Sequence, residues 1–156
     1  MAKINYLIGD ATKPIGQENK IITHVCNDIG AWGAGFVLAI SKKWKEPEKK
    51  YKEWFKSKDK FELGKVQYVQ VEKDIVIANM IGQHGIKTFG YNKPIRYDAI
   101  EECLEKVAIV CKNNNATIHM PRIGCGLAGG EWEEIEKIIN KTLIEKDIEV
   151  FVYDLK

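Results

Sequence analysis

The sequence predicts a single α/β domain built around a mixed β-sheet. Short apolar runs of strand-like composition alternate with longer segments in which apolar residues recur at helical spacing, which is the pattern of an α/β layer fold. The length of 156 residues is that of one ordinary domain. The chain has no internal repeat and no linker rich in Pro or Ser, so residues 1–156 are expected to form one unit.

Six short runs are predicted to be strands, because each is dominated by β-branched, aromatic or other apolar residues. In chain order they are Ile4–Ile8, Ile21–Cys26, Val66–Val71, Ile75–Met80, Ala116–Met120 and Glu149–Tyr153. Only three residues separate the third run from the fourth. Such a short connection favours an antiparallel hairpin, and a hairpin within an α/β fold gives a mixed sheet.

Four segments are predicted to be helices. In Arg96–Asn113 the apolar residues recur every three or four positions and form one buried stripe, and Glu131–Ile144 repeats this pattern. Two shorter helices are expected over Gly35–Lys43 and Pro47–Lys58. Pro47 suits the first turn of its helix, where the fixed φ and the missing N–H of proline are tolerated.

The composition excludes several classes of protein. Hydrophobic residues make up 45% and charged residues 29% of the chain, and the net charge is only +2, so no strong field draws it to nucleic acid or anionic lipid. The four cysteines form no CxxC pair, and no cluster of acidic residues suggests a metal site. No signal peptide or bilayer-spanning segment is evident. We expect a cytoplasmic monomer without a metal or cofactor.

Glycine marks the expected binding site. Ten of the 13 glycines lie in the segments 30–35, 82–90 and 124–130, and each segment follows a predicted strand. Glycine lets backbone N–H groups approach a ligand closely, and N–H groups at the start of a helix favour phosphate. The first and third segments are therefore expected to face each other around phosphate groups. The alternative is that they are tight turns between strands and helices.

The residues around these loops resemble those of macro domains. Ile22–Asp28 followed by Trp32–Phe36 is similar to the first binding loop of that family, and Met120–Leu127 followed by Trp132 is similar to the second. Ile8–Asp10 and Val152–Leu155 match the outer edges of the same fold. The resemblance covers nearly the whole chain. It looks nearest to the small stand-alone branch that holds the fungal ADP-ribose 1″-phosphate phosphatase and the terminal ADP-ribose protein glycohydrolase.

This resemblance implies a three-layer α/β/α sandwich around a six-stranded mixed sheet, with ADP-ribose in a cleft across the strand ends. Asp10 and the backbone of Ala11 would bind the adenine, and Tyr153 would lie near it. Asn27 would hydrogen-bond the distal ribose. The two loops would enclose the diphosphate through the predicted ligand-binding residues Gly33, Ala34, Gly35, Phe36, Arg122, Gly124, Cys125, Gly126, Leu127, Ala128 and Gly129.

Three residues are candidates for catalysis: His24, Asp28 and His84. In the phosphatase branch a histidine is implicated at the place of His24, and an imidazole titrating near neutral pH can act as base or nucleophile. Asp28 could orient water, and His84 with Gln83 could reach the distal ribose. Structural alternatives are a buried histidine, an Asx turn and a solvated loop. Relatives that use a lysyl intermediate have lysine and aspartate where this chain has Gln83 and Ala128.

The sequence thus predicts a hydrolase acting at the distal ribose of ADP-ribose derivatives, which releases either a 1″-phosphate or ADP-ribose attached to protein or nucleic acid. A module that binds ADP-ribose without catalysis is the alternative. A third hypothesis is a nucleic-acid binder that uses the nine lysines between residues 42 and 60. The helical spacing of Tyr51, Trp54 and Phe55 favours an amphipathic surface helix over this third hypothesis.

Overall fold

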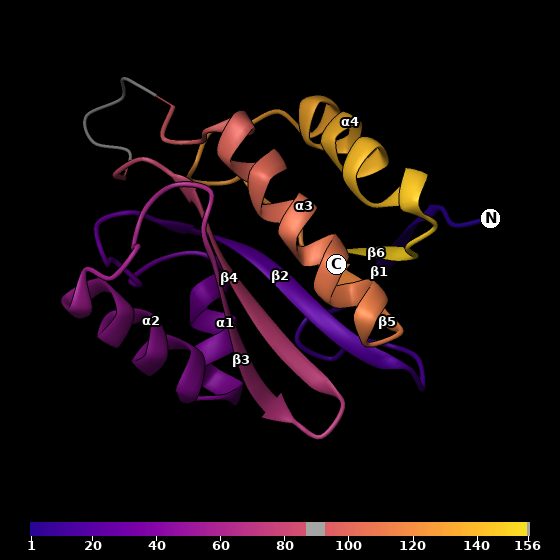
Figure 1. The fold of residues 1–156 in the computed structure, drawn as a ribbon, viewed down its shortest axis with the longest axis horizontal. Coiled ribbons are helices and arrows are strands. Elements are labelled where there is room, and N and C mark those ends of the chain that lie inside the picture. Colours follow the sequence, from indigo (N-terminus) through magenta and orange to yellow (C-terminus); the bar gives the residue numbers. More distant parts are fainter. Residues whose placement is uncertain (87–92, 156) are drawn as a thin grey trace.

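The computed structural model describes residues 1–86 and 93–155, and in it a mixed sheet lies between two pairs of helices (Figure 1). Gly90, counted above among the clustered glycines, lies outside the described residues. The elements in chain order are β1 (Ile4–Ile8), β2 (Asn19–Asn27), α1 (Phe36–Lys43), α2 (Glu46–Ser57), β3 (Val66–Glu72), β4 (Ile75–Gln83), α3 (Tyr97–Asn113), β5 (Ala116–Met120), α4 (Trp132–Thr142), the 3-10 turn η1 (Ile144–Lys146) and β6 (Val150–Asp154).

The six strands form one sheet in the order β1-β6-β5-β2-β4-β3. Neighbouring strands are parallel except for β3 and β4, which pair antiparallel as the short connection between them predicts. The sheet is therefore mixed. The two longest strands, β2 and β4, lie side by side near its middle.

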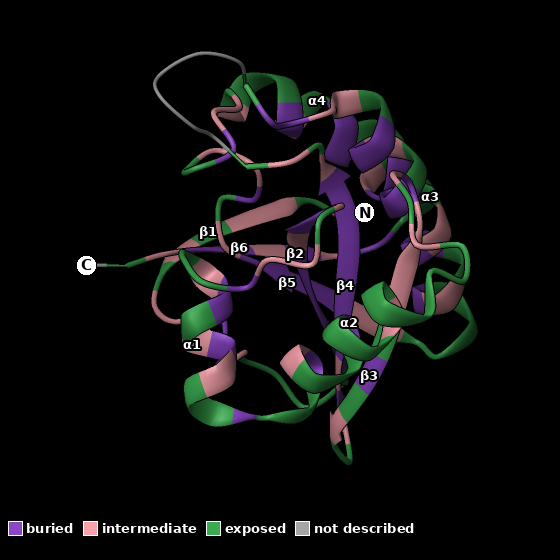
Figure 2. Ribbon diagram, turned by 90° about the vertical axis from the view of Figure 1, so that its left-hand side faces the viewer, coloured by how far each residue is buried: buried purple, intermediate pink, exposed green. Residues whose placement is uncertain are grey.

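The helices cover both faces of the sheet, so the expected three-layer sandwich is confirmed. Helices α1 and α2 lie on one face, and α3 and α4 lie on the other (Figure 1). Successive residues of β2 serve the two faces in turn: Ile21 packs in the core under α3 and α4, and Ile22 packs in the core under α1. The central strands are buried, whereas the helices expose their outer sides (Figure 2). Burial on both faces explains why these strands are apolar runs rather than alternating ones.

One predicted helix boundary needs correction. The helix expected over residues 131–144 ends as an α-helix at Thr142, and its last turn becomes η1. Asp147 then adopts φ +62°, and the N–H of Ile148 donates to the carbonyl of Leu143 at 3.1 Å, which turns the chain toward β6. Pro47 does lie in the first turn of α2.

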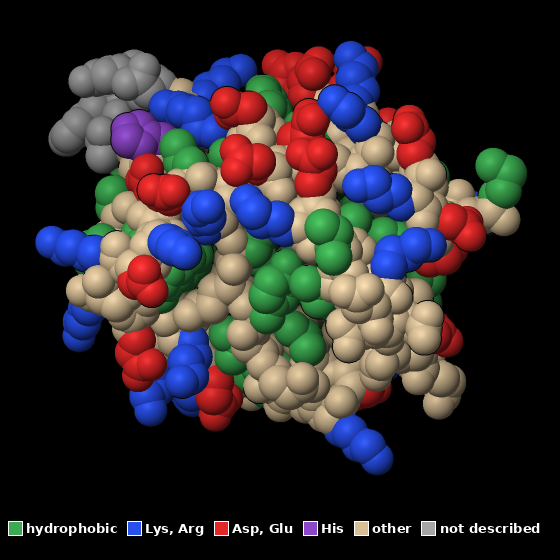
Figure 3. All heavy atoms as spheres, viewed as in Figure 1, with side chains coloured by type: hydrophobic (Ala, Val, Ile, Leu, Met, Phe, Trp, Pro, Cys, Tyr) green, Lys and Arg blue, Asp and Glu red, His purple; other side chains and the backbone are tan. Residues whose placement is uncertain are grey.

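The surface carries charges of both signs. On the face shown in Figure 3, basic and acidic side chains are interspersed over the helices, as the small net charge implies. Within residues 1–86 and 93–155, no helix has both the length and the hydrophobicity that crossing a bilayer requires.

Candidate functional site

The carboxyl ends of β2 and β5 lie side by side, and the chain leaves them toward opposite faces of the sheet. After β2 it runs to α1, and after β5 it runs to α4. Such a point in a parallel sheet leaves a crevice between the two connecting loops. Here a cavity of about 210 Å³ is lined by residues 34–37 from the first loop and by residues 121–124 and 126–128 from the second. The two glycine-rich loops therefore face each other, as expected.

This central cavity lies between two larger ones. A cavity of about 470 Å³ at the β1–β6 side shares Phe36 and Pro121 with it. A cavity of about 450 Å³ on the other side shares Ala34, Gln83 and Leu127. Because neighbouring cavities share walls, the three form one groove along the strand ends. We call them the β1-side, central and β4-side cavities.

Two glycines in the groove have no structural need to be glycine. A Cβ at Gly33 or at Gly126 would meet no atom within 4 Å, and neither residue has a positive φ. By contrast, Gly124 has φ +73° and would place a Cβ 2.3 Å from the Ile95 side chain. Gly33 lines the β4-side cavity and Gly126 lines the central one. Close approach of a ligand to the backbone explains glycine at these two open positions.

Asp10 is held at the wall of the β1-side cavity by the turn that follows β1. Its Oδ1 accepts hydrogen bonds from the N–H of Thr12 at 2.8 Å and from the Thr12 hydroxyl at 2.7 Å. Burial raises the pKa of the Asp10 carboxyl, but the bonds from Thr12 and the charges of Lys13 and Lys43 outweigh it and lower the pKa overall. Asp10 therefore presents an ionised carboxylate beside Ala11 and Tyr153.

Tyr153 is fixed in this wall by a buried chain of hydrogen bonds. Its hydroxyl lies 2.7 Å from Nδ1 of His119 and accepts the N–H of Ile15 at 3.0 Å. Nε2 of His119 lies 2.7 Å from the Thr117 hydroxyl. Burial lowers the pKa of His119 to about 3, so the ring is neutral. All donors are satisfied when Tyr153 donates to Nδ1 and Nε2–H donates to Thr117.

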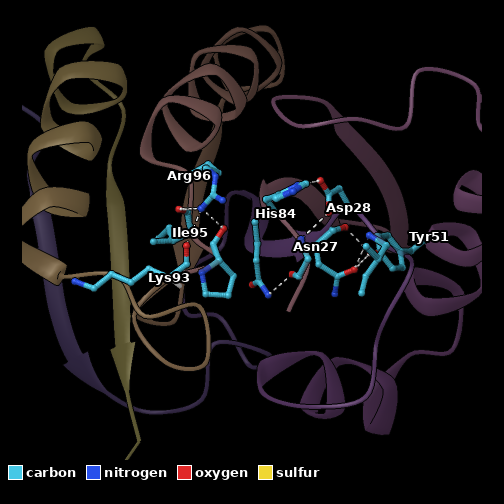
Figure 4. A network of polar contacts seen from close by, with 11 residues as sticks. Asn27, Asp28, Tyr51, His84, Lys93, Ile95 and Arg96 are labelled. Atoms are coloured by element: carbon cyan, nitrogen blue, oxygen red, sulfur yellow. Dashed lines mark hydrogen bonds and ion pairs between the residues drawn. The ribbon is translucent and has the colours of Figure 1, made fainter. Parts of the chain in front are cut away.

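Asn27 organises the loop after β2. Its Oδ1 accepts from the N–H groups of Ile29 and Ala31, each at 3.0 Å, and from the Tyr51 hydroxyl at 2.9 Å. Its Nδ2 donates to the carbonyl of Ala31 at 2.8 Å (Figure 4). Asn27 also lines the β4-side cavity. The second N–H of its amide is the part of the side chain left for a ligand.

The structure pairs two of the predicted catalytic residues. Nδ1 of His84 lies 2.7 Å from Oδ2 of Asp28, and the other oxygen of Asp28 accepts the N–H of Gly85 at 2.7 Å (Figure 4). Neither side chain lines one of the three cavities. The adjacent Gln83 lines both the central and the β4-side cavity. The pair therefore lies at the rim of the groove.

His24 is one of the residues that line the central cavity, although its side chain is almost completely buried. It is 2% exposed, and its Nε2 is 2.5 Å from Oδ1 of Asn79. Burial lowers its pKa to about 4, only partly offset by the bond to Asn79. Trp32 and Phe36 pack around the ring at centroid distances of 5.4 and 6.0 Å. His24 is thus the buried, neutral, hydrogen-bonded histidine that the structural alternative described.

Arg122 lies in the wall of the central cavity and is held from several sides. Its Nε and Nη2 donate to the two oxygens of Asp154, each at 2.8 Å, and this pair raises the pKa of the guanidinium. The guanidinium carbon is 5.0 Å from the ring centroids of both Tyr6 and Trp132. Nη1 is left for a ligand. Sequence reasoning missed Asp154 and Tyr6, because no spacing rule links residues so far apart in the chain.

Two of the predicted ligand-binding residues in the second loop lie outside the lining of the central cavity. Cys125 and Gly129 belong to the second loop but do not line the central cavity. Burial raises the pKa of the Cys125 thiol, with Arg122 opposing the shift. Within the described part of the chain, His, Cys, Asp and Glu form no group that could hold a metal ion.

In an open α/β sheet, the crevice between two loops that leave neighbouring strands toward opposite faces is a common place for a ligand to bind. The family model described as "Macro domain" matches residues 23–139, which is more than half of the chain. The chain therefore belongs to the macro domain family. This agrees with the resemblance noted in its two loops.

Three further comparisons show what the chain is similar to. A protein of unknown function from Bacteroides thetaiotaomicron is 58% identical, and its solved structure superposes with a TM-score of 0.96 over 99% of both chains. Mouse chromodomain-helicase-DNA-binding protein 1-like is 32% identical over 159 residues, 96% of this chain but only 17% of that protein. The ADP-ribose 1″-phosphate phosphatase of Lodderomyces elongisporus is 24% identical over 161 residues, 97% of this chain and 99% of the relative.

Proposed function

We propose that this chain binds ADP-ribose along the groove and hydrolyses derivatives of it at the distal ribose. The observation that carries the proposal is the central cavity, in which two loops with open glycines face each other between two larger cavities. ADP-ribose has a matching order of parts, because its diphosphate lies between two ribosyl groups. The fungal relative that matches over its whole length is named for an ADP-ribose derivative.

Each part of the ligand has a matching wall. Adenine would lie in the β1-side cavity, where the Asp10 carboxylate can accept from its amino group and Tyr153 provides an aromatic wall. The diphosphate would lie against the backbone N–H groups of Gly33–Phe36 and Gly124–Gly129, with Nη1 of Arg122 nearby. The distal ribose would lie in the β4-side cavity, within reach of the free amide hydrogen of Asn27 and of Gln83.

For catalysis we propose His84 as the base and Asp28 as its positioning residue. When Nδ1–H of His84 donates to Asp28, Nε2 of the exposed imidazole can take a proton from water. His24 is a weaker candidate because its ring is enclosed and already bonded to Asn79. The activity would be phosphate release from a 1″-phosphate, or release of ADP-ribose from a modified protein or nucleic acid.

A second function is binding without catalysis. It is favoured by the chemistry of the β4-side cavity, whose described lining includes no carboxylate, lysine or histidine. A site of this kind can hold the distal ribose without an acid or base in contact with it. The two functions share the binding groove and differ only in turnover.

We also propose that the protein is a cytoplasmic monomer. All four cysteines are free thiols: Cys26, Cys103 and Cys111 are buried and Cys125 is half-buried. Free thiols are typical of a reducing compartment.

Calorimetry with ADP-ribose and with AMP tests binding. AMP fills only the β1-side cavity and part of the central one, so we expect ADP-ribose to bind at least tenfold more tightly. Equal affinities would contradict the proposed groove.

Release of phosphate from ADP-ribose 1″-phosphate, and of ADP-ribose from a glutamyl ester, tests catalysis. We expect turnover of at least one substrate, and we expect His84→Ala to lower kcat by at least tenfold without changing the affinity for ADP-ribose. Lys49→Gln, an exposed change on α2, serves as the control. Tight binding with no turnover of either substrate would leave the binding module as the function.

A further inference from the structure

Arg96 lies at the N-cap of α3, a position that does not favour arginine. The residue at an N-cap usually accepts a hydrogen bond from an N–H group of the first turn, and the arginine side chain has no acceptor. Its positive charge also opposes the positive end of the helix dipole. Accordingly, residue 96 forms no side-chain cap. The stability of the helix therefore does not explain an arginine at this place.

The side chain of Arg96 instead holds the three residues that precede the helix. Its Nη1 donates to the carbonyls of Lys93, Pro94 and Ile95 at 2.7, 3.1 and 2.8 Å (Figure 4). Hydrogen bonds from a charged donor are stronger than those from a neutral one. Because all three bonds end on one nitrogen atom, a single cation fixes the course of the chain from residue 93 to residue 95. We call these three residues the 93–95 segment.

On one side, the 93–95 segment is bonded to the end of β4 and the residue that follows it. The N–H of His84 donates to the carbonyl of Pro94 at 2.8 Å. Gln83 forms an antiparallel bridge with Ile95, and Gln83 lines both the central and the β4-side cavity. The backbone that carries the proposed base therefore rests on the segment that Arg96 holds.

On the other side, the 93–95 segment supports the second glycine-rich loop. The N–H of Ile95 donates to the carbonyl of Ala128 at 3.1 Å, and Ala128 lines the central cavity. The buried side chain of Ile95 packs against the loop, since a Cβ at Gly124 or Gly130 would lie 2.3 or 2.6 Å from its Cδ1. A shift of Ile95 would therefore move the N–H groups that we propose for the diphosphate.

We propose that Arg96 is a positioning residue, which keeps the proposed base and the second glycine-rich loop in fixed relative positions through the 93–95 segment. The inference rests on the proposed function, because it takes His84 as the base and the central cavity as the diphosphate site. Arg96 lines none of the three cavities, so it acts on a ligand through the backbone that it holds. An arginine that is unfavourable for the helix is then useful to the groove.

Arg96→Asn tests the proposal, because asparagine can cap the helix but is too short to bond all three carbonyls. We expect the midpoint of urea denaturation to stay the same or to rise. The affinity for ADP-ribose, measured by calorimetry, and kcat should each fall by about fivefold or more. An unchanged affinity, an unchanged kcat, or a midpoint that falls together with the affinity would overturn the proposal. In a parent that turns over no substrate, the affinity alone decides.

Two control variants separate position from charge. Arg96→Lys keeps the charge and the donors, and should bind ADP-ribose within about threefold of the parent. Lys112→Asn, an exposed change in the last turn of α3, alters the net charge as Arg96→Asn does and should leave affinity and kcat unchanged.

Salt separates the two explanations further. The loss in Arg96→Asn should persist at about 300 mM salt, and a loss that disappears there would overturn the proposal, because Arg96 would then act through its charge. If the parent does not bind ADP-ribose, the proposed function fails. If the parent binds and Arg96→Asn binds equally well, only the role of Arg96 is wrong.

Discussion

At the scale of single residues, some polar atoms in the groove are hydrogen-bonded within the protein, and others have no partner among the described residues. Nε and Nη2 of Arg122 donate to the two oxygens of Asp154, whereas Nη1 has no partner among the described residues. Oδ1 of Asp10 is bonded to Thr12, and Oδ2 has no described partner. Gly126 contacts nothing at its Cβ position. The free groups lie along one path, which is the argument for a ligand there.

Gly126 offers the sharpest test at this scale. Gly126→Glu should lower the affinity for ADP-ribose by at least tenfold, because a carboxylate would enter the cavity proposed for the diphosphate. Gly126→Gln adds a side chain of similar size without the charge and should lower the affinity less. Because a Cβ at this position meets no neighbouring atom, the free energy of unfolding of both variants should be within about 1 kcal/mol of that of the parent. Unchanged affinity in Gly126→Glu, measured by calorimetry, would show that the diphosphate lies elsewhere.

At the scale of elements, the shape of the groove depends on loops that buried side chains hold in place. The side chain of Asn27 holds the loop after β2 through hydrogen bonds from its N–H groups. Tyr51 of α2 holds Asn27 in turn, because its hydroxyl bonds the Asn27 side chain and lies 2.6 Å from the Asn27 carbonyl. The loop after β4 is tied to the loop after β2 by Asp28. Helix α2 therefore supports the groove although it contributes no lining residue to the three cavities.

Asn27→Ala should destabilise the fold by about 2–4 kcal/mol, because the N–H groups of Ile29 and Ala31 and the hydroxyl of Tyr51 lose one acceptor. Asn27→Asp keeps that acceptor and loses only the bond to the Ala31 carbonyl, so its loss should be smaller. Urea denaturation measures both free energies of unfolding. Equal stability of the parent and the alanine variant would mean that the loop does not depend on Asn27.

At the scale of the whole molecule, the fold buries two neutral histidines, His24 and His119, on the same face of the sheet. Burial lowers the pKa of His24 to about 4 and that of His119 to about 3, whereas both titrate near 6.5 when the chain is unfolded. Below pH 6.5 the unfolded chain therefore binds more protons than the folded one. The stabilising effect of keeping these rings neutral is present above pH 6.5 and is lost as the pH falls.

The free energy of unfolding should thus decrease as the pH is lowered from 6.5 to 5, by up to about 1.4 kcal/mol per pH unit for each buried histidine. Denaturation in urea at several pH values measures this slope. His119→Phe removes one of the two groups and should reduce the slope by about half, whatever its effect on stability at pH 7. A slope that does not change in this variant would show that His119 is not protonated on unfolding.

The sequence by itself determined the order and type of the elements and the two loops that face the groove. It could do so because strand and helix patterns are local, and because the loops are marked by glycines that follow predicted strands. Only the tertiary structure decided which side chains meet. Asp28 with His84 and His119 with Tyr153 come together because parallel pairing places strands distant in the chain side by side. Contacts of this kind depend on strand order, and no spacing within the chain encodes that order.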